Sequence, residues 1–175
     1  LRISQQAQRI ESSFVDDESS YEFRTLSEVV EEAINAANLE GEPEMTVTFP
    51  ATECQVYSKL ELAIRELLKN AVKHNDSSDP EVAITIERTP TDGESWVAVD
   101  VADNGPGIPE NERQVLRDGE ESPLLHGEGL GLWLVNWIVS ELGGEINIQD
   151  NQPRGSIVTL QVPVWAERKQ SKQYK

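Results

Sequence analysis

The sequence predicts an α+β fold, a two-layer sandwich in which helices cover one face of a mixed, mostly antiparallel sheet. Segments with alternating apolar residues occur in pairs joined by short turns, which is typical of β-hairpins. Between them lie stretches whose apolar residues recur at helical spacing. The chain has 175 residues, of which 37% are hydrophobic, so it is long enough for one domain with its own core. Paired strands with helices over one face make the two layers.

The first third of the chain predicts two helices and two short strands. Residues 3–14 carry apolar residues at helical spacing, so we expect the chain to enter as a helix. The stretch TLSE at 25–28 is a capping box, and it opens a helix that is expected to end near Gly41. MTVTFP at 45–50 alternates as a strand does, and a second short strand is expected around CQVY at 54–57.

The middle of the chain predicts a long helix and a hairpin. A second capping box, SKLE at 58–61, opens an amphipathic helix. Its inward residues are Leu60, Ile64, Leu67, Leu68, Ala71 and Val72. EVAITIERT at 81–89 and SWVAVDVAD at 95–103 are alternating strands separated by a turn signal, so they form the hairpin.

The last third predicts a loop, a helix and a second hairpin. Residues 110–126 are polar with few apolar anchors, which indicates a mobile loop with one short helix. An apolar helix follows from about Leu130 to Leu142 and is stopped by a pair of glycines. EINIQD and GSIVTLQVPV then form two strands around a turn at 151–155, and a charged tail ends the chain.

Composition limits the classes of function. The chain has 32 acidic and 15 basic residues, a net charge of −17. Such a surface repels nucleic acids and anionic membranes. The composition fits either an ordinary solvated acidic surface or adaptation to high salt. At 1 M ionic strength the Debye length is only about 3 Å, so the repulsion between the acidic groups largely vanishes. The single cysteine, Cys54, forms no intrachain disulfide and fits the reducing cytoplasm.

Two further features concern the chain as a whole. Its apolar runs are all shorter than the roughly 20 residues of a membrane helix, so we expect no membrane insertion in this chain. It starts with LRISQQAQRI, which is neither a signal peptide nor a methionine start, so we expect a piece of a longer protein.

The glycine-rich stretch HGEGLGLWLV is the first candidate for chemistry. Gly127, Gly129 and Gly131 precede a helix, whose free N–H groups and dipole favour an anion. The spacing matches neither a Walker A loop nor the dinucleotide fingerprint. A glycine-rich loop that only turns the chain is the alternative.

The stretch ADNGPGIP is the second candidate. Asp103 ends a buried strand, and Gly105 and Gly107 flank a proline, so sharp turns are possible on both sides. A plain turn, in which Asp103 and Asn104 satisfy nearby backbone groups, is the alternative. That alternative explains Asn104 and Gly105, but not the second glycine and the two prolines.

The stretch ELLKNAVKHN on the long helix is the third candidate. Glu66 and Asn70 are four residues apart and share one face, and Lys73 and His74 follow on the same side. An ordinary solvated helix face is the alternative. Asparagine is unfavourable in the middle of a helix, which argues for a role for Asn70.

Taken together and in this order, the three motifs resemble the histidine-kinase branch of the superfamily of gyrase, heat-shock-chaperone, histidine-kinase and mismatch-repair ATPases. ELLKNAVKH resembles the asparagine-bearing box, DNGPGIP the first glycine box and GEGLGL the second. The resemblance covers about residues 25–164. HGEGLGLWLVNW further resembles kinases of halophilic archaea, which is consistent with the acidic composition.

The resemblance implies an ATP site with Mg²⁺. Asn70 is implied to coordinate Mg²⁺, and Glu66 to lie near the γ-phosphate and polarise the attacking group. Lys73 and His74 are implied to lie beside the phosphates, and Asp103 to accept a hydrogen bond from the adenine amino group. The other implied nucleotide contacts are Gly105, Gly107, Ile108, Gly127, Gly129, Leu130, Gly131, Leu132 and Ser156.

The implied ATP lid, residues 110–126, departs from the family pattern. It contains no phenylalanine, and Glu128 stands where the family often has Thr or Ser. Arg113 and Arg117 are candidate phosphate partners, with solvated surface charges as the alternative.

The resemblance also implies an overall function and its parts. The two histidines, His74 and His126, both lie in the ATP motifs, so the phosphate acceptor is expected outside this chain. Residues 1–20 are implied to be the end of a dimerisation helix with its linker, 21–165 the ATP-binding kinase domain and 166–175 a charged tail.

The implied activity is phosphoryl transfer from Mg²⁺·ATP to a histidine of the dimerisation domain, and onward to an aspartate of a response-regulator receiver domain. The implied location is the cytoplasm, also as the cytoplasmic part of a membrane-bound sensor. An anti-sigma-type serine kinase, a gyrase-type ATPase and a nucleotide-sensing module without transferase activity are the alternatives. A purely structural acidic domain leaves the three motifs unexplained.

Overall fold

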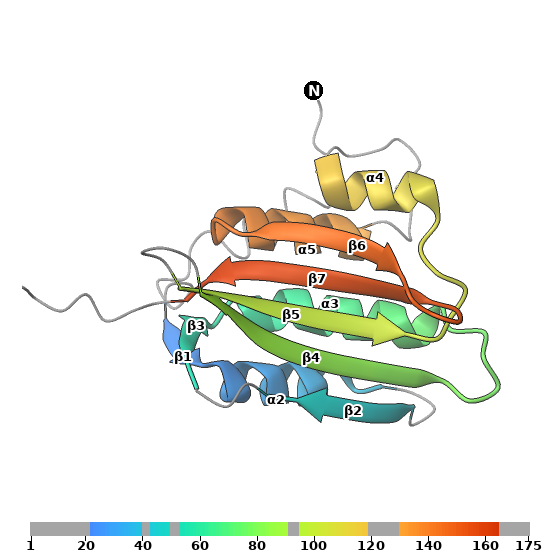
Figure 1. The fold of residues 1–175 in the computed structure, drawn as a ribbon, viewed down its shortest axis with the longest axis horizontal. Coiled ribbons are helices and arrows are strands. Elements are labelled where there is room, and N and C mark those ends of the chain that lie inside the picture. Colours follow the sequence, from blue (N-terminus) through green and yellow to red (C-terminus); the bar gives the residue numbers. More distant parts are fainter. Residues whose placement is uncertain (1–21, 40–42, 50–52, 91–94, 119–129, 165–175) are drawn as a thin grey trace, which may run out of the picture.

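The structure, a computed structural model, describes residues 22–39, 43–49, 53–90, 95–118 and 130–164. The helix predicted at 3–14, the glycines Gly127 and Gly129 and the charged tail at 166–175 lie outside these ranges. Figure 1 shows the described residues as two layers, with a sheet in front and helices behind it. The predicted two-layer α+β sandwich is therefore confirmed.

Five strands form the main sheet in the order β2–β4–β5–β7–β6. They are β2 (Glu44–Thr48), β4 (Glu81–Pro90), β5 (Ser95–Asp103), β6 (Glu145–Asp150) and β7 (Ser156–Pro163). The pair β2–β4 is parallel and the other three neighbouring pairs are antiparallel. A separate sheet pairs β1 (Phe23–Thr25) with β3 (Gln55–Tyr57). The two predicted hairpins are thus present, and β1 is a strand that the sequence did not predict.

Three helices cover one face of the main sheet (Figure 1): α2 (Leu26–Ala37), α3 (Leu60–Lys73) and α5 (Leu130–Glu141). The shorter α4 (Glu110–Asp118) contacts α5 and β6. The predicted short helix within 110–126 is therefore present. Valines at alternate positions of β5, namely Val97, Val99 and Val101, are buried under the helices, as the strand period requires.

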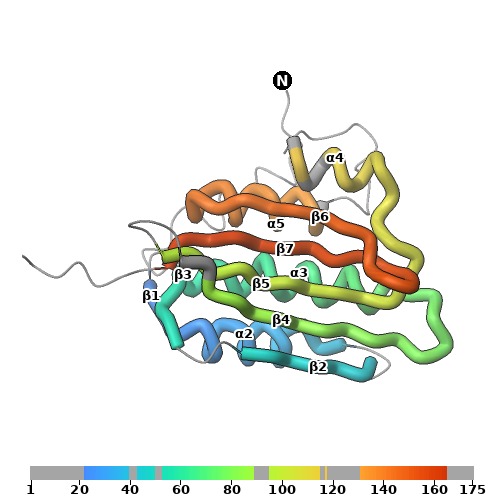
Figure 2. The backbone as a smooth tube through the Cα atoms, in the orientation of Figure 1, coloured from blue at the N-terminus to red at the C-terminus, as the bar shows by residue number. Residues whose placement is uncertain are grey.

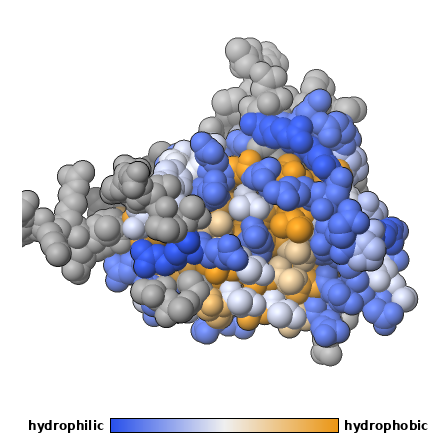
Figure 3. Space-filling model, in the orientation of Figure 1, coloured by the Kyte–Doolittle hydropathy of each residue, from blue (hydrophilic) through white to orange (hydrophobic). Residues whose placement is uncertain are grey.

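The other face of the sheet is left uncovered by the described helices. Figure 3 shows hydrophilic and hydrophobic residues side by side on that face. Its middle carries a polar pair, in which the Thr159 hydroxyl donates to the Asp100 carboxylate at 2.6 Å. Small side chains such as Ala98 and Ala102 stand on either side of Asp100 along β5. The core therefore lies between the sheet and the helices.

The two predicted capping boxes have different outcomes. At the start of α2, the Glu28 N–H donates to the Thr25 hydroxyl at 3.4 Å, and the Thr25 N–H donates to the Glu28 carboxylate at 3.1 Å. The box predicted at Ser58–Glu61 is wrong. The residue before α3 is Lys59, in helical conformation and without a side-chain cap. The Ser58 carbonyl instead accepts the Glu61 N–H at 3.0 Å, so the backbone provides the cap.

Two helices end where a residue with positive φ follows. The prediction that α2 ends near Gly41 is wrong, because Asn38 adopts a left-handed conformation with φ of 46° directly after Ala37. The end of α5 agrees with the prediction. Gly143 has φ of 73°, and the Gly144 N–H donates to the Val139 carbonyl at 2.8 Å.

Three connections meet at one end of the sheet (Figure 2). They are the loop from α3 to β4, the segment that leaves β5 toward α4, and the turn between β6 and β7. The carboxyl end of α3 lies at the same end of the sheet. Segments far apart in the sequence thus surround one region.

Candidate functional site

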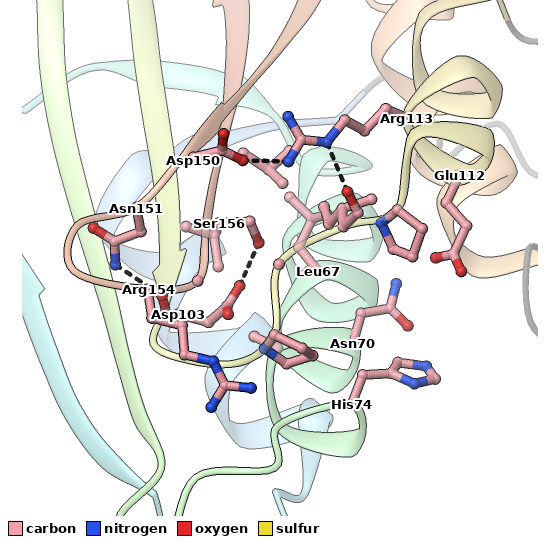
Figure 4. Close-up of a pocket in the computed structure, with 18 of the residues that line it drawn as sticks. Leu67, Asn70, His74, Asp103, Glu112, Arg113, Asp150, Asn151, Arg154 and Ser156 are labelled. Carbon is pink, nitrogen blue, oxygen red and sulfur yellow. Dashed lines mark hydrogen bonds and ion pairs between the residues drawn. The ribbon is translucent and has the colours of Figure 1, made fainter.

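A cavity of about 560 Å³ lies where these connections meet. One wall comes from α3, with Leu67, Asn70 and His74. A second comes from the segment after β5 and from α4, and a third from the turn between β6 and β7. In Figure 4, Asp103 and Ser156 lie on one side of the cavity, and Asn70, His74 and Glu112 on the other.

The Asp103 carboxylate is held in one position at the inner end of the cavity. Its Oδ2 atom accepts a hydrogen bond from the Ser156 hydroxyl at 2.5 Å, and its Oδ1 atom accepts the Gly105 N–H at 2.8 Å. Ser156 is 2% exposed. The side chains of Val101 and Val158 also line this end. The result is a fixed acceptor beside apolar walls.

The turn between β6 and β7 packs directly against the Asp103 backbone. Gly155 has φ of +111°, and a Cβ atom there would lie 1.9 Å from the Asp103 carbonyl oxygen. The Asn151 side chain donates to the same carbonyl at 2.8 Å. Only glycine permits this approach at position 155. The sequence predicted this segment as a hairpin turn, and the family resemblance implied only its end, at Gly155 and Ser156, to lie beside the adenine.

Asn104 joins the loop after α3 to the end of β5. Its Oδ1 atom accepts from the Asn75 side chain at 2.9 Å and from the Glu81 N–H at 3.0 Å. Its Nδ2 atom donates to the Asp79 carbonyl at 2.9 Å. Asn104 therefore fixes a neighbouring loop, and it does not line the cavity.

Asn70 lies at the other end of the cavity, on α3. Its Nδ2 atom is buried and has no hydrogen-bond partner in the described part of the chain. Gly131, at the start of α5, packs against the same edge. A Cβ atom at position 131 would lie 3.4 Å from Glu66 Oε2 and 3.5 Å from Asn70 Nδ2. The start of α5 thus adjoins the helix edge that carries both side chains.

Glu66 is paired on its own helix. Its Oε1 atom lies 3.1 Å from Lys69 Nζ and 3.9 Å from Arg65 Nε. Its side chain is about one fifth exposed. Glu66 does not line the cavity itself but adjoins Asn70 through Gly131. Of the two cation contacts, only the one with Lys69 is a hydrogen bond.

Two residues of α4 face the cavity, and the sequence predicted one of them. Arg113 donates from Nε to the Ile108 carbonyl at 2.7 Å, and its Nη2 atom pairs with Asp150. Glu112 also lines the cavity. Arg117, the other candidate phosphate partner, pairs with Glu110 at 3.1 Å and does not line the cavity.

An ion pair also joins two loops near the inner end. Arg154 Nη2 donates to Asp76 Oδ2 at 2.7 Å. This hydrogen bond holds the pKa of Asp76 below its usual range. Arg154 lines the cavity. The pair connects the turn between β6 and β7 with the loop after α3.

The structure brings many of the predicted site residues together. The cavity is lined by the predicted residues Asn70, His74, Asp103, Gly107, Ile108, Leu132 and Ser156. Glu66, Lys73, Gly105 and Gly131 lie outside its lining. Gly127, Gly129 and the side chain of Leu130 are outside what the structure describes.

Sequence reasoning missed several lining residues. Glu112, Asp150, Asn151, Arg154 and Gly155 were not among the predicted contacts. A Gly-Ser pair at 155–156, at the start of the strand that begins beside Asp103, was the available signal for the turn. The positions of Glu112 and Asp150 depend on how α4 packs on β6, which no local pattern specifies.

The comparisons with known proteins agree with this geometry. The family of histidine kinase-, DNA gyrase B- and HSP90-like ATPases matches residues 55–166, a range that contains the whole cavity lining. The chain belongs to this family. Within it, the domain is the catalytic ATP-binding domain of the sensor histidine kinases, as the sequence predicted.

Individual relatives are sensor kinases of bacteria. The chain is 33% identical over 119 residues to the adaptive-response sensory kinase SasA of Prochlorococcus marinus, which is 65% of this chain and 30% of the relative. It is 31% identical over 121 residues to the autoinducer 2 sensor kinase/phosphatase LuxQ of Vibrio vulnificus, 64% of this chain and 14% of the relative. The chain thus spans less than a third of these relatives.

Solved structures show the same fold. The mycobacterial sensor histidine kinase MprB superposes with a TM-score of 0.65 and 27% identity, over 82% of this chain and 97% of that one. The ATP-binding domain of PrrB from Mycobacterium tuberculosis superposes with a TM-score of 0.61 and 22% identity, over 84% and 99%. In the described ranges, no helix is long and apolar enough to cross a membrane.

Proposed function

We propose that this domain binds Mg²⁺·ATP with the adenine at the Asp103 end of the cavity and the phosphates at the Asn70 end. The γ-phosphate is then presented to a histidine outside these 175 residues. One observation carries the proposal: a single cavity is lined both by the fixed Asp103–Ser156 pair and by an amide of α3 that lacks a partner.

The inner end has the chemistry that an adenine ring needs. The Asp103 carboxylate has lone pairs beyond those used by Ser156 and Gly105, and they can accept the exocyclic amino group. Val101 and Val158 offer apolar surface to the faces of the ring. Since both Asp103 oxygens are already held by hydrogen bonds, the carboxylate is oriented before the base arrives.

The residues at the outer end fit a magnesium–phosphate group. An amide oxygen is a hard ligand of the kind that Mg²⁺ prefers, and Asn70 offers one. Its buried Nδ2 atom, without a described partner, is a donor that a phosphate oxygen can satisfy. When bound, the ion would neutralise negative charge on the phosphates.

Glu66 is the residue that we propose to act on the acceptor. Phosphoryl transfer depends on positioning and on electrostatics more than on covalent help from the protein. Lys69 donates a hydrogen bond to the Glu66 carboxylate, and Gly131 allows the start of α5 to lie against it. In that position the carboxylate can polarise an N–H of the incoming imidazole.

The proposed partners follow from the expectation that the histidine that accepts the phosphoryl group lies outside this chain. They are the dimerisation domain of the same protein, which supplies the histidine, and a receiver domain, which takes the phosphoryl group on an aspartate. We place the reaction in the cytoplasm, where ATP is available.

A test of the proposal separates binding from transfer. The 175-residue chain is expected to bind ATP but to acquire no phosphate from labelled ATP by itself. Adding the histidine-bearing dimerisation domain is expected to give acid-labile phosphate on that domain. Acid-stable phosphate on a serine would instead support a serine kinase, and stable label on the isolated chain would contradict the proposal.

We also propose that the acidic surface is an adaptation to high salt. The net charge of −17 repels itself at low ionic strength and is screened at about 1 M salt, where the Debye length is about 3 Å. The midpoint of thermal unfolding is expected to rise between 0.1 and 2 M potassium chloride. A midpoint that is constant or falls would exclude the adaptation.

A further inference from the structure

Charged groups on the cavity wall are unbalanced. The described lining residues include three carboxylates, Asp103, Glu112 and Asp150, against two guanidinium groups, Arg113 and Arg154. The cavity proposed to receive a highly negative nucleotide is therefore itself negative. Like charges at short range repel, and partial burial weakens the screening by water.

The three carboxylates differ in their hydrogen-bond and ion-pair partners. Asp103 is bonded to the Ser156 hydroxyl and to the Gly105 N–H. Asp150 is paired with Arg113. The Glu112 carboxylate alone has no hydrogen bond or ion pair with any side chain that the structure describes.

Neither arginine is free to neutralise Glu112. Arg113 is 17% exposed and is already held by Asp150 and by the Ile108 carbonyl. Arg154 is paired with Asp76 beyond the opposite wall. A partly buried carboxylate without a partner among the described residues, in a site proposed for an anion, is unfavourable unless a cation joins it.

The position of Glu112 on α4 directs its carboxylate toward the cavity. Glu110, in the same first turn, pairs with Arg117 outside the cavity lining. Glu112 instead points to the side of the cavity where Asn70 and His74 lie (Figure 4). Favourable interaction with the helix dipole would account for either residue, but not for the orientation of Glu112 into the cavity.

From this geometry we infer that Glu112 faces the divalent cation of the nucleotide complex and makes nucleotide binding depend on that cation. The carboxylate repels nucleotide that arrives without metal and attracts the ion when it is present. Asn70, on the same side of the cavity, supplies a neutral oxygen. The inference rests on the proposed nucleotide site and adds a metal-selecting residue to it.

The experiment measures the dissociation constant of ADP by calorimetry, with excess Mg²⁺ and with excess chelator. The ratio of the two constants defines the advantage given by the metal. For Glu112→Gln, metal-free ADP is expected to bind more tightly, and the metal advantage is expected to fall about 5-fold. Glu112→Asp, which keeps the charge on a shorter side chain, is expected to retain part of the advantage.

Glu110→Gln is the matched control, because it removes one carboxylate from the same helix turn outside the cavity. It is expected to leave the metal advantage within about 2-fold of the parent value. If Glu112→Gln leaves the advantage unchanged, or tightens ADP equally with and without Mg²⁺, the inference is overturned. If the parent chain binds no ADP under either condition, the proposed function itself fails, so the two failures are distinguishable.

Discussion

At the inner end of the cavity the polar groups of Asp103, Ser156 and Asn151 are hydrogen-bonded to one another, whereas at the outer end Asn70 and Glu112 have groups without partners among the described residues. The inner end is therefore shaped before any ligand binds. The outer end is complete only with a charged ligand. The difference teaches that the hydrogen bonds are complete at the end that we propose for the base and incomplete at the end that we propose for the phosphates, which would keep the ordering cost of base binding small.

The largest expected effect comes from breaking the rigid end. Gly155→Ala would place a methyl group 1.9 Å from the Asp103 carbonyl oxygen, so the turn between β6 and β7 has to move. We expect ATP affinity to fall more than about 100-fold, with a loss of stability of at least about 1–3 kcal/mol. Calorimetry and urea unfolding measure the two effects.

Gly143→Ala is the control for this substitution. Gly143 also has a positive φ, of 73°, but a Cβ atom there would have nothing within 4 Å. A stability cost of about 1–2 kcal/mol and unchanged affinity are expected. Similar ATP affinity for Gly155→Ala and Gly143→Ala would show that the tight contact between Gly155 and Asp103 does not contribute to nucleotide binding.

The second effect tests the acceptor at the inner end. Asp103→Asn replaces a carboxylate oxygen by an N–H donor, which in the proposed complex would face the adenine amino group. A mispaired polar group costs about 1–3 kcal/mol, so ATP affinity is expected to fall about 5- to 150-fold. Asp100→Asn, on the same strand but bonded to Thr159 on the uncovered face, is the control. Unchanged affinity in Asp103→Asn would remove this residue from the base site.

The third effect tests the unsatisfied end. Asn70→Ala removes the amide that we propose for the ion, so Mg²⁺ should no longer strengthen nucleotide binding, a loss of about 10-fold. Affinity without Mg²⁺ should change little. Asn147→Ala, an exposed position on β6, is the control. A variant at Asn70 that keeps the Mg²⁺ dependence of the parent chain would rule out the assignment.

The fourth effect concerns the ion pair that joins α4 to the end of β6 at the cavity wall. Arg113 on α4 pairs with Asp150 at the end of β6. A double-mutant cycle with Arg113→Gln and Asp150→Asn is expected to give a coupling of about 0.5–1 kcal/mol in unfolding free energy, because Asp150 is largely exposed. The more exposed pair of Arg117 and Glu110 is expected to couple less. Equal coupling energies would show that burial of Arg113 adds nothing.

The smallest effect is a dependence on pH at the inner rim. The pKa of Asp76 is lowered by the Arg154 hydrogen bond. Its contribution to stability is thus present above the unfolded-state pKa and is lost as the pH falls through the lowered folded-state pKa. Arg154→Gln should be slightly less stable than the parent at pH 7 and equal to it near pH 2. Urea unfolding of both proteins across this pH range measures the difference in stability. A difference that grows as the pH falls would contradict this assignment.

Periodicity predicted most of the fold, because the long segments bury one face. The alternating valines of β5 and the amphipathic pattern of α3 both follow directly from the sequence. The strand Phe23–Thr25 was missed since three residues carry too little pattern. The capping box at Ser58 failed because the Ser58 N–H is bonded to the Glu22 carbonyl at 2.8 Å, a long-range contact that fixes the backbone there.

Motifs predicted both ends of the candidate site but not its rim. Asn70 and Asp103 stand out locally, one as an asparagine inside a helix and the other as an acid at the end of a buried strand. Glu112 and Asp150 look like ordinary surface acids. Their place on the cavity comes from tertiary packing of α4 and β6, which a single sequence does not reveal. The same holds for Gly155, whose constraint comes from the approach of Asp103.

The hydrogen bond between Asp103 and Ser156 joins residues 53 positions apart, and it exists only once β5 lies beside β7. The hairpins β4–β5 and β6–β7 can each form from neighbouring residues, but their union closes a long loop and should be among the slow events of folding. A partly folded chain without that union lacks the end of the cavity that we propose for the base. Nucleotide in the surrounding solution would thus favour the finished sheet over every earlier intermediate, and would act as a thermodynamic check on maturation.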